Sequence, residues 1–225
     1  MKPLSSILNA LPPTKVIDAA INLSQYVRLD LSVTNREFAD TRPETAEDFE
    51  NYISNYLKKN NAKVAFGGYI EGRFLYKRSS IFKDDSKPER NIHIGLDLWA
   101  EEGTSVLAAL DGKVHSFKNN VGLGDYGPTI ILEHEVQKKI FYTLYGHLSL
   151  ESIENLTVGD NFKKGDKIAT LGNASVNGDY APHVHFQIIH NIEDYWGDYP
   201  GVCNTNDLNF YIENCPDPNL LLKIT

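Results

Sequence analysis

The sequence predicts a mainly β fold with a helical N-terminal segment, and therefore an α+β protein overall. From about Phe66 onward, short runs rich in Val, Ile, Leu, Phe, Tyr and Thr alternate with turn pairs, among them Asp111-Gly112 and Gly159-Asp160. No long helical pattern lies among these runs, so we expect the strands to form an antiparallel sheet. Before Phe66, apolar residues recur at helical spacing instead.

The composition indicates a globular protein and excludes some classes of binding partner. A chain of 225 residues is long enough for a full hydrophobic core, and 41% hydrophobic with 23% charged residues is ordinary for a globular protein. The net charge of -8 argues against nucleic acid or an anionic membrane as the main partner, because both require clustered Lys and Arg.

No stretch of the sequence reaches the apolar length of a membrane span. The opening MKPLSSILNALPPTK lacks the continuous apolar core of a secretory signal. By default, the expectation is a cytoplasmic protein without a membrane span, of unknown oligomeric state.

The N-terminal part, residues 1–65, is expected to be a helical appendage. TKVIDAAINLSQYV, residues 14–27, carries apolar residues at helical spacing. TAEDFENYISNYLKKNN is a clearer helix, since Thr45 and Asp48 form a capping-box pattern ahead of an apolar stripe. The connection over residues 28–44 is expected to be irregular. A packing role and a role in shielding a groove both remain open for this appendage.

Residues 66–190 are expected to form one β-domain. Its predicted strands lie in VLAAL-DG-KVHSF, PTIILEHEV, KIFYTLYGHL and KIATLG. Residues 191–225 are aromatic and turn-rich, and we expect them to pack on the β-domain as an extension. This extension holds Cys203 and Cys215, for which a disulfide and two reduced thiols are both open possibilities.

Two short stretches, HIGLD and PHVHF, place scarce histidines in motif-like settings. In a strand, His183 and His185 point to the same face, although an isolated His-x-His is more often structural than functional. In extended backbone His93 and Asp97 would stand about 13 Å apart, too far to share an ion. Gly95 lies midway between them and permits a bend that lets the two side chains converge.

Taken together, these residues form a chemically coherent set. Two imidazoles and a carboxylate suit catalytic zinc and leave a fourth position for water. The helical H-E-x-x-H signature and the serine motif G-x-S-x-G are both absent. A further histidine, His147 in LYGHLS, ends a strand-like run and could supply an acid, a base or an oxyanion donor.

Seven segments follow one another in an order typical of a known family: GGYIEGR, HIGLDL, EEGTSVLAALDGKVHSF, GDYGPTIILEH, TLYGHLS, VGDNFKKGDKIATLGN and APHVHFQI. In these segments the region from about Phe66 to His190 resembles the lysostaphin-type (LytM-like) zinc endopeptidases, which cut peptide cross-bridges or stems of bacterial peptidoglycan. The resemblance implies an antiparallel β-sheet with a groove, of the duplicated hybrid motif type. The similar stretches GTSVLAALDGKVHSF and VGDNFKKGDKIATLG are consistent with such a duplication.

The resemblance also implies site residues. It assigns His93, Asp97 and His185 as ligands of one Zn²⁺ ion, and leaves His147 and His183 beside the metal as catalytic residues. Which of these two is the base stays open. The remaining histidines, His115, His134 and His190, fall outside the motif positions.

Walls of the substrate groove are expected from two glycine-containing loops. These loops are NNVGLGDYGPT, with Tyr126, and ASVNGDYAP, with Tyr180. Their glycines permit close approach of an extended peptide, although plain hairpin turns are an equal possibility for either loop.

Three features depart from the family pattern: valine stands between the paired histidines, Gln187 stands where glutamate is common, and no export signal is visible. The expected function is a zinc-dependent endopeptidase acting on peptide or peptidoglycan. The main alternative is a catalytically silent zinc-containing module that binds peptide or glycan. A sugar-phosphotransfer carrier is a further alternative, although it has no use for Asp97 beside His93.

Overall fold

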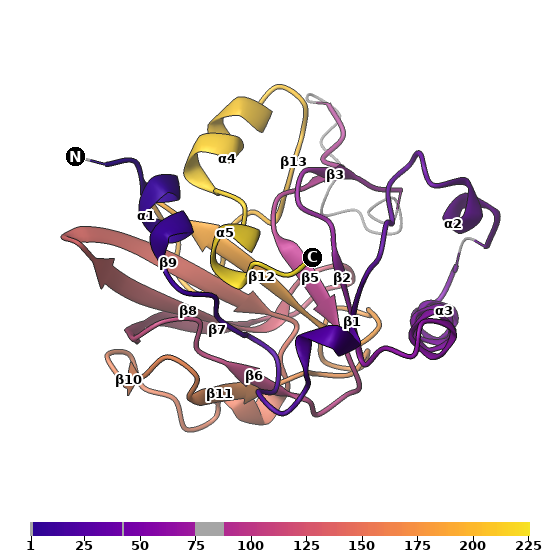
Figure 1. Ribbon diagram of the computed structural model, residues 1–225, viewed down its shortest axis with the longest axis horizontal. Coiled ribbons are helices and arrows are strands. Elements are labelled where there is room, and N and C mark those ends of the chain that lie inside the picture. The colour runs from indigo at the N-terminus through magenta and orange to yellow at the C-terminus, as the bar shows by residue number, and fades with distance from the viewer. Residues whose placement is uncertain (1, 42, 75–87) are drawn as a thin grey trace.

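The computed structural model describes residues 2–41, 43–74 and 88–225. An eight-stranded sheet dominates it, in the order β1-β2-β5-β12-β9-β8-β7-β10 (Figure 1). The strands are β1 Tyr26–Arg28, β2 Val64–Gly67, β5 Leu96–Trp99, β12 His183–Ile189, β9 Lys139–Gly146, β8 Gly127–Val136, β7 Gly112–Asn120 and β10 Asn161–Phe162. Neighbouring strands pair antiparallel except β1 and β2, which are parallel. The predicted mainly β fold is confirmed.

Two smaller sheets accompany the main one. Strands β6 (Ser105–Leu107) and β11 (Lys167–Thr170) pair with each other, and they come from the two stretches whose similarity suggested a duplication. The second small sheet has the order β13-β4-β3 and joins Val202–Cys203, Ile92–His93 and Glu71–Gly72. It therefore ties the C-terminal extension to the strand that carries His93.

Around β12 the large sheet is covered on both faces, because side chains alternate between the faces and every residue of this strand is buried. On β12, Val184, Phe186 and Ile188 enter the main core. That core also receives the short helices α1 (Leu4–Ala10) and α5 (Asn219–Leu222), which lie near one another in Figure 1. The opposite face carries His183, His185 and Gln187, and there the C-terminal extension with α4 (Leu208–Asn214) supplies much of a second cluster.

The helix at residues 46–59 is confirmed, and its cap is the predicted one. In α3 (Ala46–Lys59), the Thr45 hydroxyl accepts from the Asp48 amide at 3.0 Å, and the Asp48 carboxylate accepts from the Thr45 amide at 3.2 Å. Phe49 and Ile53 are buried, and they pack in a cluster with Trp99 of β5. The helix is thereby fixed against the strand that carries Asp97.

The helix predicted over residues 14–27 is wrong. Val16 and Ile17 are buried outside any helix, and Ile17 forms an isolated β-bridge with Val106. The Asp18 side chain then accepts from the Ala20 amide in a turn, and β1 begins at Tyr26. The apolar spacing reflects separate core contacts, since tertiary packing overrides a weak helical pattern.

The connection between β1 and α3 also differs from the expectation, because it contains a short helix, α2 (Arg36–Thr41). The division of the chain at residues 65 and 190 stays a prediction, and β2 crosses the first of these positions. Within the described ranges, no helix combines the length and the apolarity that crossing a membrane requires.

Candidate metal centre

Strand register brings the distant motifs together. On β12, His185 lies directly opposite Asp97 of β5, and His183 lies opposite Trp99. Between β4 and β5 the chain bends at Gly95, as the sequence suggested, so that His93 turns back toward Asp97. A Cβ atom at Gly95 would stand 2.4 Å from Cε1 of His185, and this position therefore requires glycine for space.

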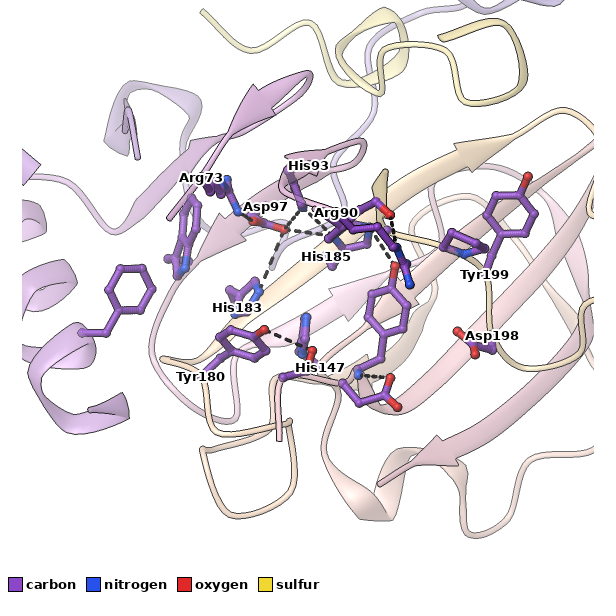
Figure 2. A pocket seen from close by; sticks show the side chains of 18 of the residues that line it. Arg73, Arg90, His93, Asp97, His147, Tyr180, His183, His185, Asp198 and Tyr199 are labelled. Atoms are coloured by element: carbon purple, nitrogen blue, oxygen red, sulfur yellow. Dashed lines mark hydrogen bonds and ion pairs between the residues drawn. The ribbon is translucent and has the colours of Figure 1, made fainter. Parts of the chain in front are cut away.

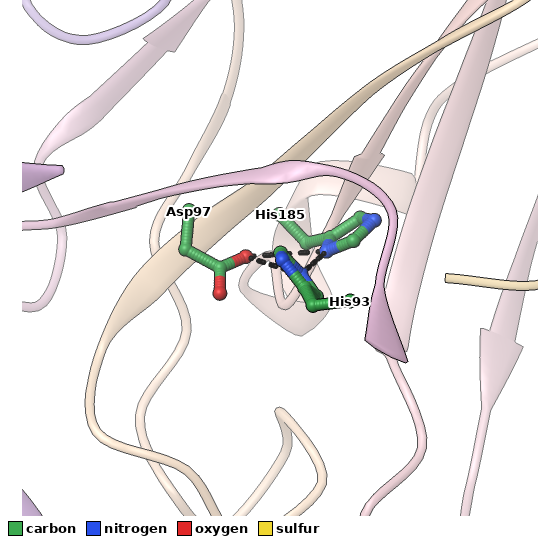
Figure 3. Close-up of side chains that lie close together, drawn as sticks. All are labelled: His93, Asp97 and His185. Carbon is green, nitrogen blue, oxygen red and sulfur yellow. Dashed lines mark hydrogen bonds and ion pairs between the residues drawn. The ribbon is translucent and has the colours of Figure 1, made fainter. Parts of the chain in front are cut away.

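Three atoms from these residues converge (Figure 3). Nε2 of His93 lies 2.8 Å from Nδ1 of His185, and Oδ1 of Asp97 lies 3.2 Å and 3.1 Å from these two nitrogens. All three side chains are buried. Ligand atoms that surround a tetrahedral zinc ion at ~2.0–2.1 Å stand about 3.3 Å from one another, so the triangle has nearly the size that such an ion requires.

Hydrogen bonds determine which nitrogen of each imidazole carries the proton. Nδ1 of His93 donates to the Gly68 carbonyl at 2.8 Å, which leaves a lone pair on Nε2. The Gln187 amide nitrogen donates to the Pro200 carbonyl at 3.1 Å, so its oxygen faces His185. That oxygen accepts from Nε2 of His185 at 2.9 Å and leaves the lone pair on Nδ1.

Three acceptors therefore point at one another, an arrangement that a cation between them would stabilise. A proton fits poorly, because burial and the charge of Arg73 lower the pKa of His93 to about 4. The donor set of two imidazole nitrogens and one carboxylate oxygen fits a divalent metal ion.

A buried arginine holds the carboxylate. Arg73 donates from Nη1 to Oδ2 of Asp97 at 2.5 Å and from Nε to Oε1 of Glu71 at 2.7 Å. Burial acts to raise the pKa of Asp97, but the adjacent His93 and Arg73 hold it well below its usual range. The residue is therefore a carboxylate, with one oxygen held by Arg73 and the other directed at the two imidazoles.

The two remaining motif histidines lie together beside the triangle (Figure 2). The ring centroids of His147 and His183 are 4.2 Å apart, and Nε2 of His183 lies 3.9 Å from Oδ1 of Asp97. Their Nδ1 atoms donate to the carbonyls of Asn177 and Ala181, which leaves a lone pair on each Nε2. Burial lowers the pKa of both, so both rings are neutral at neutral pH.

A cavity of about 300 Å³ opens over these side chains, and both predicted groove residues line it. The Tyr126 ring lies 5.4 Å from His147 and 5.1 Å from His185, and its hydroxyl is 3.4 Å from Nε2 of His185. Tyr180 meets His147 edge to face at 5.1 Å, and its hydroxyl donates to the Gly124 carbonyl. A role for either tyrosine in binding substrate stays a prediction.

Several residues of this site were not assigned from the sequence. Arg73 lies in GGYIEGR, a segment that contributed to the resemblance but not to the predicted site residues. The C-terminal extension lines the cavity with residues 198–202, and Figure 2 shows Asp198 and Tyr199 on the side away from His183. No motif in the extension indicated this, because its contacts depend on the tertiary fold.

The remaining histidines do not line the cavity. His134 is buried within the sheet, with Nδ1 donating to the Asp111 carbonyl and Nε2 bonded to the Thr143 hydroxyl. Cys203 and Cys215 are both buried and free, so the structure has reduced thiols at these positions.

Residues 91–195 match the model of peptidase family M23. This segment includes His93, Asp97 and His185. This segment is an M23 peptidase domain. The family is one of metallopeptidases, and the cluster of His93, Asp97 and His185 could hold the metal.

Among known proteins, this chain is similar to several peptidases. An uncharacterized metalloprotease of Haemophilus influenzae is 32% identical over 95 residues, which cover 42% of this chain and 18% of that protein's length. The catalytic domain of the antimicrobial peptidase lysostaphin from Staphylococcus simulans is 26% identical, with 68% of this chain and 93% of that chain covered and a TM-score of 0.41. A zinc-containing peptidase from Vibrio cholerae is 27% identical, with 47% and 29% covered and a TM-score of 0.36.

Proposed function

We propose that this protein is a zinc-dependent endopeptidase that hydrolyses amide bonds in peptidoglycan cross-bridges or stem peptides. One observation carries the proposal: three lone-pair atoms from His93, Asp97 and His185 converge beside two neutral histidines at the floor of a cavity. The M23 domain match supports peptidase chemistry, and the lysostaphin-type motif order supports peptidoglycan as the substrate class.

Zinc is the proposed ion because two imidazoles and one carboxylate are a ligand set that it prefers, with a fourth position left for solvent. When bound, zinc would lower the pKa of water at that position toward ~7 and would polarise the scissile carbonyl. His93 and His185 present lone pairs for it, while Arg73 fixes the orientation of the Asp97 carboxylate.

His147 and His183 are the proposed acid–base pair. Each is neutral, and each directs Nε2 away from a carbonyl that holds its Nδ1. One ring can accept the proton of the attacking water and deliver it to the leaving amine. For the other ring to donate a hydrogen bond to the oxyanion that develops on the carbonyl, its Nε2 must first take up a proton from solvent, because in the resting protein this nitrogen carries only a lone pair.

The proposed substrate is an extended peptide that enters the cavity lined by Tyr126, Tyr180 and residues 198–202 of the C-terminal extension. Both tyrosines are more than nine-tenths buried, and each has its hydroxyl close to a partner in the wall. Their rings therefore present firm apolar surfaces against which a peptide backbone can be aligned.

Substitutions should separate the two roles. His185→Ala should lose zinc, because it removes a ligand atom of the triangle. His147→Ala and His183→Ala should keep zinc and lose turnover by roughly 10²–10⁴, as is typical for a positioned acid–base group. Zinc content after gel filtration and peptidase rates give the two readouts, and equal loss of zinc in all three variants would contradict these roles.

The substrate test is incubation of the zinc-loaded protein with purified cell-wall sacculi, followed by mass analysis of released peptides. The expected products are peptides with new amine and carboxyl ends at one type of bond. Binding to sacculi without any release, in a protein that holds one zinc ion, would instead indicate a catalytically silent binding module.

A further inference from the structure

A chain of hydrogen bonds leads from His185 through Gln187 to the C-terminal extension. Gln187 lies two residues further along β12, is fully buried, and faces the same side of the sheet as His185. Its side-chain oxygen accepts from Nε2 of His185 at 2.9 Å. Its amide nitrogen donates to the Pro200 carbonyl at 3.1 Å and to Sγ of Cys215 at 3.2 Å.

Those two acceptors belong to the C-terminal extension. Burial raises the pKa of Cys215 to about 12, so the sulfur is a neutral thiol and an acceptor for the amide. The Pro200 carbonyl can only accept. A glutamate at position 187 would have no hydrogen to offer either group, whereas the glutamine amide satisfies both of them and His185.

The same stretch of the extension contacts the metal centre at further points. The Gly201 carbonyl accepts from the Ile94 amide at 3.0 Å, and Val202 pairs with His93 between β13 and β4. A Cβ atom at Gly201 would stand 1.9 Å from the Tyr126 hydroxyl and 3.2 Å from Cε1 of His185. The extension is therefore packed against both imidazole ligands, with no room for a side chain at Gly201.

We propose that Gln187 is a positioning residue that fixes His185 with Nδ1 toward the metal and couples this ligand to the C-terminal extension through Pro200 and Cys215. The inference rests on the proposed metal site. Partners of this kind in the outer shell set the tautomer and the ring orientation of a ligating histidine, and their loss typically weakens metal binding by about 10–100-fold.

Two variants of Gln187 test the role. Gln187→Met keeps the volume but removes the acceptor for His185, and zinc affinity measured against a chromophoric chelator should fall about 10–100-fold. Gln187→Glu keeps that acceptor, and its zinc affinity should stay within about threefold of wild type while its stability falls, because the Pro200 carbonyl and Cys215 lose their donor.

Asn120 offers a matched control. It is a buried amide that donates at 2.8 Å to the Gly197 carbonyl, also in the extension, and it does not line the cavity. Asn120→Leu should lose stability without loss of zinc affinity. The proposal is overturned if Gln187→Met binds zinc as wild type does, or if Asn120→Leu weakens zinc binding as much as Gln187→Met.

NMR of the imidazole nitrogens provides a readout that does not depend on zinc. In the metal-free wild-type protein, Nε2 of His185 should carry a slowly exchanging proton, and in Gln187→Met this preference should disappear. A His185 with no proton on Nε2 would overturn the proposal. Failure of the wild-type protein to bind zinc would instead refute the proposed function, while the tautomer measurement would still decide the role of Gln187.

Discussion

At the scale of single residues, the centre requires two glycines, because their missing side chains leave room for the His185 ring. Gly95 and Gly201 lie on different segments, and a Cβ atom at either would press on the His185 ring. The His185 ring, a proposed metal ligand, is therefore held between two stretches of backbone, with little freedom to turn. Such confinement reduces the conformational freedom that His185 must lose when it binds an ion.

Gly95→Ala should displace His185, since the added Cβ atom would lie 2.4 Å from Cε1 of its ring. We expect the variant to fold and to bind zinc at least tenfold more weakly, as measured by competition with a chelator. Gly122→Ala is the control, because its Cβ would make an ordinary 3.5 Å contact with Asp125. Wild-type zinc affinity in Gly95→Ala would show that the ring has more room than the structure gives it.

Arg73→Gln should unbalance the buried charges, since Asp97 and Glu71 both lose their cation. Removal of one partner of a buried pair typically costs about 3–5 kcal/mol. We expect a loss of this size in urea unfolding of the metal-free protein, and a smaller loss with zinc bound, because the ion also faces Asp97. Lys163→Gln, which breaks the exposed pair with Asp111, should change stability by less than about 1 kcal/mol.

At the scale of elements, a single strand, β12, supplies both core packing and residues of the proposed metal centre. On β12 the side chains on one face, Val184 and Phe186, pack in the main core, while His183 and His185 face the cavity. On β8, His134 interrupts an apolar run in the same sheet and is buried as a neutral ring. This histidine gives the sheet a dependence on pH that is independent of the metal.

Burial lowers the pKa of His134 to about 4, below the ~6.5 of an unfolded chain. The contribution of the neutral His134 ring to the free energy of unfolding is therefore fully present above about pH 6.5. It is lost as the pH falls toward 4, by roughly 3 kcal/mol in total. His134→Gln should show a correspondingly flatter dependence of unfolding free energy on pH between 6.5 and 4. Parallel pH profiles for the variant and the wild type would contradict this assignment.

At the scale of the whole molecule, three segments far apart in the sequence meet at one centre, so a bound ion should stabilise the complete fold. Free zinc at a thousand times its dissociation constant contributes about 4 kcal/mol, which corresponds to a rise in Tm of about 8–16 °C for a chain of this size. Calorimetry of the protein with added zinc and with a chelator measures this rise in Tm. His185→Ala should show no such rise.

Much of this centre could be predicted from the sequence, because His93, Asp97, His147, His183 and His185 stand in short motifs with recognisable spacing. Gln187 was visible only as a departure from the family pattern. Its partners Pro200 and Cys215 carried no local signal, because their contacts arise from packing of the extension. The helix expected over residues 14–27 failed for a related reason, since Val16 and Ile17 are apolar for the core that they join.

The alignment of β12 with β5 has a consequence for how the chain reaches its native state. Sliding β12 by one residue would bring Val184 or Phe186 opposite Asp97 and would turn His185 toward the other side of the sheet. Only correctly aligned molecules would then bring the three proposed metal ligands together. Metal supplied during refolding should therefore stabilise the molecules in which β12 and β5 are correctly aligned. Molecules with a shifted register gain no such stabilisation, so their strands can separate and pair again.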